Sequence, residues 1–170
     1  MEAKQLEQLA TAIHENAVEH GWWDEERPFD EIAALCSSEL AEALEESRAG
    51  RAMVWYDGDK PEGIAVEMAD CLIRILDYFG KVGFVQGYQT ISKAKREKKT
   101  LSAAIMATNY ELAAANKSTG HMGHLRDIHM ASAACEIVGW FGNIELDVLA
   151  VVREKHEYNK TRPYKHGKKF

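Results

Sequence analysis

Two short acidic repeats carry the residues of this chain that are best suited to chemistry. Glu39-Leu40-Ala41-Glu42 and Glu67-Met68-Ala69-Asp70 each place two carboxylates three residues apart, in stretches that favour helix. Residues i and i+3 share a helix face, so two such helices packed together would gather four carboxylates around a small volume. Carboxylates that close repel unless a cation neutralises them, and hard oxygen ligands suit Mg²⁺ or Mn²⁺. We therefore expect a divalent-metal site in a helical bundle that acts on a nucleotide.

Glu39 breaks the usual pattern of an amphipathic helix. The segment 29–49 has an apolar stripe with helical periodicity, formed by Ile32, Leu35, Cys36, Leu40 and Ala43. Glu39 and Glu46 fall within this stripe, and Glu42 lies at its edge. Buried carboxylates are costly unless they are paired or bind metal, so the stripe predicts a functional role for them.

The second repeat also has a simpler explanation. Glu67, Asp70, Arg74 and Asp77 form one polar ladder on an otherwise apolar helix. An ion pair between Asp70 and Arg74 within that helix, with Glu67 as a bystander, would account for this ladder alone. It would not account for a matching acidic ladder inside the core stripe of another helix, so the pattern favours metal.

The elements that must position these residues are helices. Apolar periodicity predicts helices over about 3–20, 29–49, 61–79, 101–116, 125–141 and 144–157. The third is expected to open at Asp59-Lys60-Pro61 and to end at Gly80, and residues 50–60 are expected to form a loop. We predict an all-α fold with a core of the four-helix-bundle type and extra helices, in a single domain spanning 1–170.

Composition indicates a soluble globular protein. The chain has 170 residues, 46% of them hydrophobic and 28% charged, and no apolar run approaches the roughly 20 residues that span a bilayer. The N-terminus is amphipathic and acidic, unlike a signal peptide. Cys36, Cys71 and Cys135 lie inside apolar helical patterns without a CxxC motif. These features predict reduced cysteines, a cytoplasmic location and no membrane partner.

Charge is unevenly distributed along the chain. The last 20 residues hold seven Lys or Arg and two Glu, whereas the first 150 hold 14 Lys or Arg and 25 Asp or Glu. An acidic body would repel a long polyanion, so we expect no long nucleic acid as a partner. A short polyphosphate bridged by metal suits both parts, with the basic tail at about 153–170 binding phosphate.

Three residues near the N-terminus admit both structural and functional interpretations. His14 lies at the edge of the apolar face of the first predicted helix, where a partly buried structural histidine is common. Trp22 and Trp23 follow in the turn, and adjacent tryptophans cannot both face one core. Packing is at least as good an explanation as stacking on a base.

The motifs together resemble a known family. Glu39-x-x-Glu42, a gap of 24 residues and Glu67-x-x-Asp70 are similar to the ExxE…ExxD signature of the MazG-like all-α nucleoside triphosphate pyrophosphohydrolases, which include dCTP and dUTP pyrophosphatases. The stretch 60–80 resembles the second metal helix of that family. The tail resembles it through Lys155-x-x-x-Asn159-x-x-Arg162-Pro163 and His166-Gly167-Lys168. The likeness covers 10–80 and 150–168, whereas 84–145 matches loosely.

The resemblance implies roles for individual residues. It implies that Glu39, Glu42, Glu67 and Asp70 bind Mg²⁺, that Lys155, Asn159, Arg162 and Lys168 contact phosphate, and that His14 and Trp23 line the base pocket. Some members carry a carboxylate just before the first metal Glu that is thought to activate water, and here Ser38 stands in its place. Glu46 or a water molecule on the metal are the alternatives for the general base. Family members form dimers, often paired, so a homodimer or a dimer of dimers is expected.

The expected reaction is Mg²⁺-dependent hydrolysis of a nucleoside or deoxynucleoside triphosphate to monophosphate and pyrophosphate, in the clearance of unwanted nucleotides. Mn²⁺ is a possible substitute for Mg²⁺. One alternative is a related hydrolase acting on another phosphorylated nucleotide, such as a phosphoribosyl-ATP-like compound. Another is a helical protein that binds nucleotide without catalysis.

Overall fold

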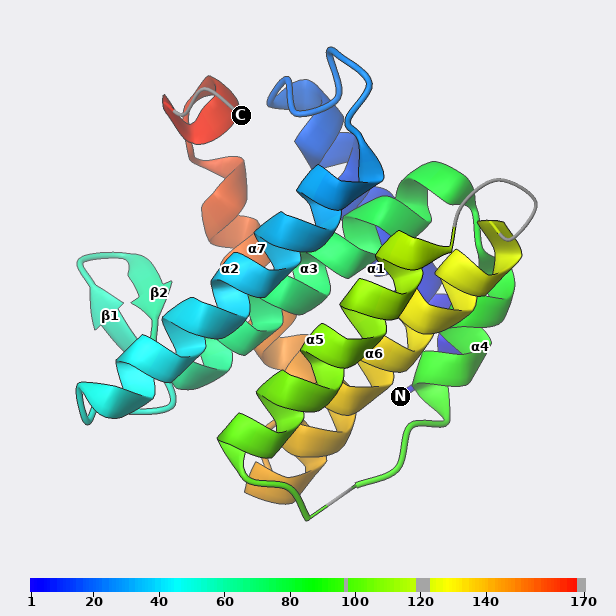
Figure 1. Cartoon of the computed structure of the whole chain (residues 1–170). Coiled ribbons are helices and arrows are strands. Elements are labelled where there is room, and N and C mark those ends of the chain that lie inside the picture. The colour runs from blue at the N-terminus through cyan, green and yellow to red at the C-terminus, as the bar shows by residue number, and fades with distance from the viewer. Residues whose placement is uncertain (97, 119–122, 168–170) are drawn as a thin grey trace.

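The computed structural model describes residues 1–96, 98–118 and 123–167. It confirms the all-α prediction, because helices account for nearly all the regular structure and the single sheet has two short strands (Figure 1). The elements are α1 (Ala3–Glu19), α2 (Phe29–Arg48), β1 (Trp55–Asp57), β2 (Lys60–Glu62), α3 (Ile64–Val82), α4 (Val85–Ser92), α5 (Leu101–Lys117), α6 (Gly123–Ile144) and α7 (Val148–Lys160), followed by a 3₁₀ turn at Tyr164–Gly167. No helix among these is long and apolar enough to cross a membrane.

Helix α3 is the centre of the molecule. It packs against α1, α2, α6 and α7, and buried apolar side chains surround it on almost every side. Helices α5 and α6 form an antiparallel pair that lies against this group, with α5 on α2 (Figure 1). Helix α3 therefore contacts both α2 and α7, and these three helices carry the predicted metal ligands and the predicted phosphate contacts Lys155 and Asn159.

A β-hairpin replaces the predicted start of the third helix. We expected that helix to open at Asp59-Lys60-Pro61, but Lys60 and Pro61 belong to β2 and the helix begins at Ile64. Strands β1 and β2 pair antiparallel with Asp57 opposite Lys60, which leaves a two-residue turn. Gly58 has a φ of +59°, as a tight hairpin turn requires of its glycine. Such short strands show no period-2 pattern, and the prediction of a loop over 50–60 missed them.

The third helix also runs past Gly80, where we expected it to end. A Cβ at position 80 would lie 2.7 Å from the carbonyl oxygen of Ala10 and 2.6 Å from the Cβ of His14. Glycine is therefore needed there for the close approach of α1 and α3, not for a cap. The left-handed residue that ends the helix is Gly83, with a φ of +68°.

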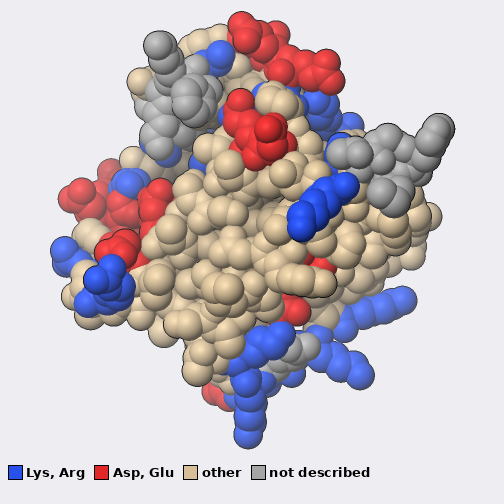
Figure 2. Space-filling model, viewed as in Figure 1, with Lys and Arg blue, Asp and Glu red and all other residues tan. Residues whose placement is uncertain are grey.

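Several large apolar side chains remain exposed on the outer helices. Met106 and Tyr110 on α5 are 68% and 71% exposed, and Leu125 and Ile128 on α6 are also exposed. Much of the face that Figure 2 shows over these helices lacks charged side chains. Apolar surface of this kind is compatible with an oligomer, which stays a prediction here.

Candidate metal and phosphate site

Three carboxylates from two helices meet at one point. Glu39 comes from α2, and Glu67 and Asp70 come from α3. One carboxylate oxygen of each lies within 4.8 Å of the others, and Glu39 and Glu67 are buried. These three residues can hold a metal ion, because buried oxygen ligands at this separation match the needs of a hard divalent cation. Glu42 lines the same pocket but is more exposed and does not belong to this group.

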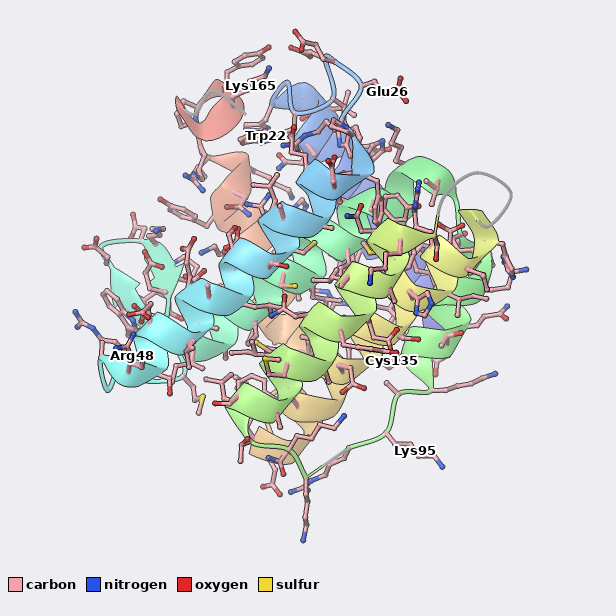
Figure 3. All side chains as sticks on the ribbon, in the orientation of Figure 1. Trp22, Glu26, Arg48, Lys95, Cys135 and Lys165 are labelled. Carbon is pink, nitrogen blue, oxygen red and sulfur yellow. The ribbon has the colours of Figure 1, made fainter. Side chains whose placement is uncertain are left out.

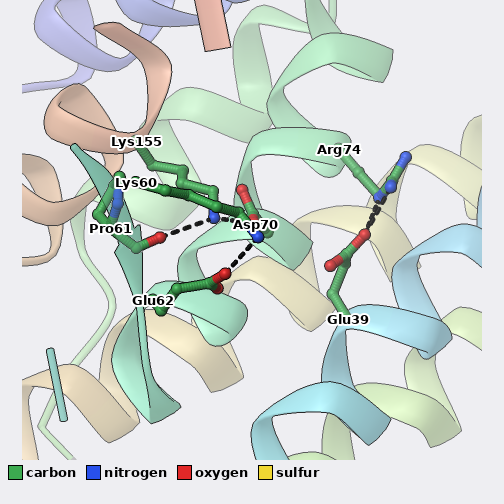
Figure 4. A network of polar contacts seen from close by, with 7 residues as sticks. All are labelled: Glu39, Lys60, Pro61, Glu62, Asp70, Arg74 and Lys155. Atoms are coloured by element: carbon green, nitrogen blue, oxygen red, sulfur yellow. Dashed lines mark hydrogen bonds and ion pairs between the residues drawn. The ribbon is translucent and has the colours of Figure 1, made fainter. Parts of the chain in front are cut away.

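Arg74 joins the two helices that carry the carboxylate cluster. Its Nε donates to Glu39 Oε1 at 2.8 Å, and its Nη2 donates to the same oxygen (Figure 4). The simpler explanation of the polar ladder paired Arg74 with Asp70 inside α3. The ion pair instead crosses from α3 to α2. The polar residues of α3 are therefore not explained by an Asp70–Arg74 pair within that helix.

Lys155 on α7 is the basic partner of Asp70. Its Nζ lies 2.9 Å from Asp70 Oδ2 and donates to the carbonyl oxygen of Pro61 at 3.1 Å (Figure 4). The lysine is 3% exposed, so both contacts are made away from water. The hairpin thus positions the lysine, and its second strand brings the Lys60–Glu62 ion pair beside it. Sequence reasoning missed this contribution of the hairpin.

The cluster holds fewer positive charges than carboxylates, and the pKa values of Glu67 and Asp70 are raised. Burial raises the pKa of Glu67 to about 9, with a further contribution from the negative charge of Asp70. Burial also raises the pKa of Asp70 to about 6, although Lys155 opposes the change. Glu67 therefore carries a proton at neutral pH when no cation is present, and a divalent cation would displace it.

The carboxylate cluster lies in a pocket of about 190 Å³ between α1, α2, α3 and α7. Its lining combines acidic and basic side chains with apolar and neutral polar side chains from α1 and α7. The lining residues are Ile13, Asn16, Ala17, Trp22, Arg27, Leu35, Glu39, Glu42, Lys60, Glu67, Asp70, Ile73, Arg74, Asp77, Lys155, His156, Asn159 and Arg162. A ligand with one anionic and one neutral part suits this division of chemistry.

The structure brings the residues of the predicted phosphate site together in that pocket. Lys155, Asn159 and Arg162 follow one another at helical spacing, and all three line it. The backbone at Arg162 is held to α1, because its carbonyl oxygen lies 3.0 Å from His20 Nε2. Lys168, the fourth predicted phosphate contact, lies outside the described residues.

The two predicted base-binding residues lie behind the pocket wall. His14 Nδ1 is 2.7 Å from Asp77 Oδ1, and Trp23 Nε1 donates to the same oxygen at 2.9 Å. Neither side chain is among those that line the pocket, whereas Asp77 and Trp22 are. Base binding by His14 and Trp23 stays a prediction. Trp22 lines this pocket, whereas Trp23 lines a smaller one that shares Arg74 and Asp77 with it.

Glu46 and Ser38 lie apart from the cluster. Glu46 accepts a hydrogen bond of 2.7 Å from Trp55 Nε1 and is not among the residues that line the pocket. Ser38 donates to the carbonyl oxygen of Leu35 at 2.9 Å. A catalytic role for Glu46 stays a prediction, and its observed partner ties the end of α2 to the hairpin.

Comparisons of the chain with protein-family models, with curated proteins and with solved structures found no significant match. The geometry of this pocket and the motifs in the sequence are therefore the features that indicate a function.

Proposed function

We propose that this protein hydrolyses nucleoside or deoxynucleoside triphosphates to a monophosphate and pyrophosphate, with Mg²⁺ as its cofactor and Mn²⁺ as a substitute. The observation that carries the proposal is the meeting of Glu39, Glu67 and Asp70 within 4.8 Å in a pocket that also holds Lys155. Such an enzyme would remove unwanted nucleotides. The resemblance to MazG-like pyrophosphohydrolases supports the same activity through its motifs.

The carboxylates and the basic residues have separate roles in this proposal. Glu39, Glu67 and Asp70 would hold the metal, and Glu42 lines the same pocket. A bound cation would neutralise part of the charge of the phosphates. Lys155 keeps Asp70 ionised and in place, because its ammonium group is buried against that carboxylate.

Bond cleavage needs charge stabilisation on the leaving group. Water adds to the α-phosphorus, the bond to the oxygen between the α- and β-phosphates breaks, and pyrophosphate leaves with that oxygen. Arg74 and Arg162 line the pocket, and their guanidinium groups suit the oxygens of a polyphosphate. The proton released from water passes to solvent or to a carboxylate of the pocket.

The first experiment is pyrophosphate release from a panel of canonical and modified nucleoside and deoxynucleoside triphosphates, with Mg²⁺ and with EDTA. We expect release that depends on Mg²⁺ from a subset of the panel. The Glu39→Gln variant should fold and lose this activity. Its matched control is Glu45→Gln on the same helix, because Glu45 is exposed and pairs only locally with Arg48. The control should retain wild-type activity.

Other outcomes separate the alternatives. Nucleotide binding that raises thermal stability without pyrophosphate release would identify a binding protein rather than an enzyme. Release from a phosphoribosyl nucleotide alone would keep the metal site and change the substrate. Unchanged Mg²⁺-dependent release by Glu39→Gln would refute the carboxylate site.

A further inference from the structure

His156 is a buried polar residue of the pocket that the proposed hydrolysis does not use. It lies on α7 next to Lys155, is 3% exposed and lines the pocket. Within the described part of the chain, its Nε2 atom is buried and has no hydrogen-bond partner. A buried polar atom left without a partner costs about 1–3 kcal/mol, so such atoms are rare unless a ligand completes them.

A second atom of the same kind lies one helical turn further on. Asn159 Oδ1 is also buried without a partner among the described residues, and Asn159 lines the same pocket. Residues 156 and 159 are three apart on α7 and therefore share a face. Two buried polar atoms on one helix face, each without a hydrogen-bond partner among the described residues, indicate one ligand that bonds to both.

The chemistry of Asn159 Oδ1 indicates a hydrogen-bond donor as its partner. An amide oxygen only accepts hydrogen bonds, and a fully ionised phosphate has no hydrogen to donate. The group that completes Asn159 Oδ1 must therefore carry an N–H or an O–H. Burial and the nearby charge of Lys160 lower the pKa of His156, so its ring is neutral at pH 7 and presents either a donor or an acceptor.

The pocket that His156 lines offers groups suited to the neutral part of a nucleotide, beside charged ones such as Arg27 and Arg162. Helix α1 contributes Ile13 and Ala17 to the pocket as apolar wall, and Trp22 contributes a flat aromatic ring. An apolar wall with a few hydrogen-bonding groups is the usual composition of a site for a small heterocycle. Figure 3 shows Trp22 at the same end of the molecule as the turn that follows α7.

We propose that His156 and Asn159 recognise the nucleoside part of the substrate, by hydrogen bonds to N–H or O–H groups of the base or the sugar. This inference rests on the proposed function, because it takes the anionic part of the pocket to hold the phosphates. It places nucleoside recognition on α7, a helix for which the sequence suggested phosphate contacts alone.

The test compares a nucleotide with a polyphosphate that lacks the nucleoside. Binding of a nucleotide with a non-hydrolysable α,β-methylene bridge and of inorganic tripolyphosphate is measured by calorimetry with Mg²⁺. His156→Ala should weaken nucleotide binding about 10- to 100-fold, the loss that one unmade buried hydrogen bond produces. Its tripolyphosphate binding should stay within about twofold of the wild type. His156→Gln should recover most of the affinity, since the glutamine amide reaches the position of Nε2.

Controls separate recognition from folding. His129→Gln on α6 changes a histidine that pairs with Glu111, distant from the pocket lining, and should bind both ligands as the wild type does. If His156→Ala does not fold, His156→Leu and His156→Gln, which both fill the site, form the comparison. Equal losses for the nucleotide and tripolyphosphate, or no loss for either, would overturn the inference.

Its failure is distinguishable from that of the proposed function. A wild-type protein that binds neither ligand overturns both proposals. A wild-type protein that binds nucleotide without releasing pyrophosphate overturns hydrolysis and leaves the binding test of His156 valid. Nucleotide analogues then show whether the hydrogen-bond donor belongs to the sugar or to the base. A His156→Ala penalty that disappears with 2′,3′-dideoxynucleotides assigns the contact to the sugar, and one that changes with the base assigns it to the base.

Discussion

Arg74 holds Glu39 through one carboxylate oxygen, since both its Nε and its Nη2 donate to Oε1. Arg74 makes neither of these hydrogen bonds to the other oxygen, Oε2, which can therefore bind a cation. With Lys155 on Asp70, the three carboxylates have two basic partners, and burial raises the pKa of Glu67 to about 9. Arg74 thus offsets part of the charge of the cluster while leaving it able to bind metal.

Removal of Arg74 should make the protein depend on divalent cation. In EDTA, Arg74→Met should lower the free energy of unfolding by about 1–3 kcal/mol, because Glu39 loses its partner while it stays 9% exposed. Mg²⁺ should raise the melting temperature of the variant more than that of the wild type. Urea unfolding and thermal scans with and without Mg²⁺ measure both effects.

Arg48→Met is the matched control for that prediction. Arg48 pairs with Glu45 on the surface of α2, and both side chains are more than 60% exposed, so the change should cost less than about 1 kcal/mol. A cost for Arg74→Met no larger than this, or an equal response to Mg²⁺ in wild type and variant, would contradict the role assigned to Arg74.

Stability without metal should fall as pH rises. The pKa of Glu67 is about 9 in the folded protein and 4.5 when it is exposed, so the folded state binds more protons between these values. The free energy of unfolding in EDTA should therefore decrease from about pH 5 to about pH 9, and the Asp70 contribution should be lost near pH 6. Urea unfolding across this range measures the slope.

Two comparisons test the origin of that slope. Glu67→Gln has no proton to lose and should flatten the curve, whereas Glu45→Gln should leave it unchanged. Mg²⁺ binding to the wild type at neutral pH should release protons, which calorimetry detects in buffers of different ionisation enthalpy. Binding without proton release would show that Glu67 is already ionised.

Periodicity revealed the part of the site that breaks a pattern within one helix. Glu39 stood out because it falls in an apolar stripe, and it lies in the carboxylate cluster. Arg74 was visible on the ladder of α3, but its partner is 35 residues away on another helix, and spacing along one helix indicates only local pairs. His156 gave no signal, because an unpartnered ring nitrogen is a property of three-dimensional packing.

The two neighbouring tryptophans should respond differently to substitution. Trp22 lines the pocket, so Trp22→Ala should weaken nucleotide binding by about 1–3 kcal/mol, the usual worth of an aromatic ring stacked on a base. Trp23→Phe removes the donor to Asp77 and should lower the free energy of unfolding by about 1 kcal/mol with less effect on nucleotide affinity. Calorimetry and urea unfolding distinguish them. A larger loss of affinity in Trp23→Phe would support the base-binding role that the sequence suggested.

The contact between Gly21 and Tyr164 docks the C-terminal turn beside the pocket. A Cβ at position 21 would lie 2.2 Å from Tyr164 Cε2, and the Tyr164 hydroxyl bonds Asp24. The backbone nitrogen of Lys165 donates to His20 O at 2.9 Å in the same place. Arg162, a pocket residue, lies between this turn and α7.

Gly21→Ala should therefore displace the Tyr164 ring and loosen the turn. Gly50→Ala is its control, since Gly50 has a similar φ, +70° against +76°, with nothing within 4 Å of the added Cβ. Both changes impose the backbone strain of a left-handed alanine, about 1 kcal/mol, and Gly21→Ala should cost about 1 kcal/mol more. In a Tyr164→Ala background the two costs should become equal, as measured by urea unfolding. If the extra cost of Gly21→Ala persists without the tyrosine ring, the turn is held by the backbone contact at His20 instead.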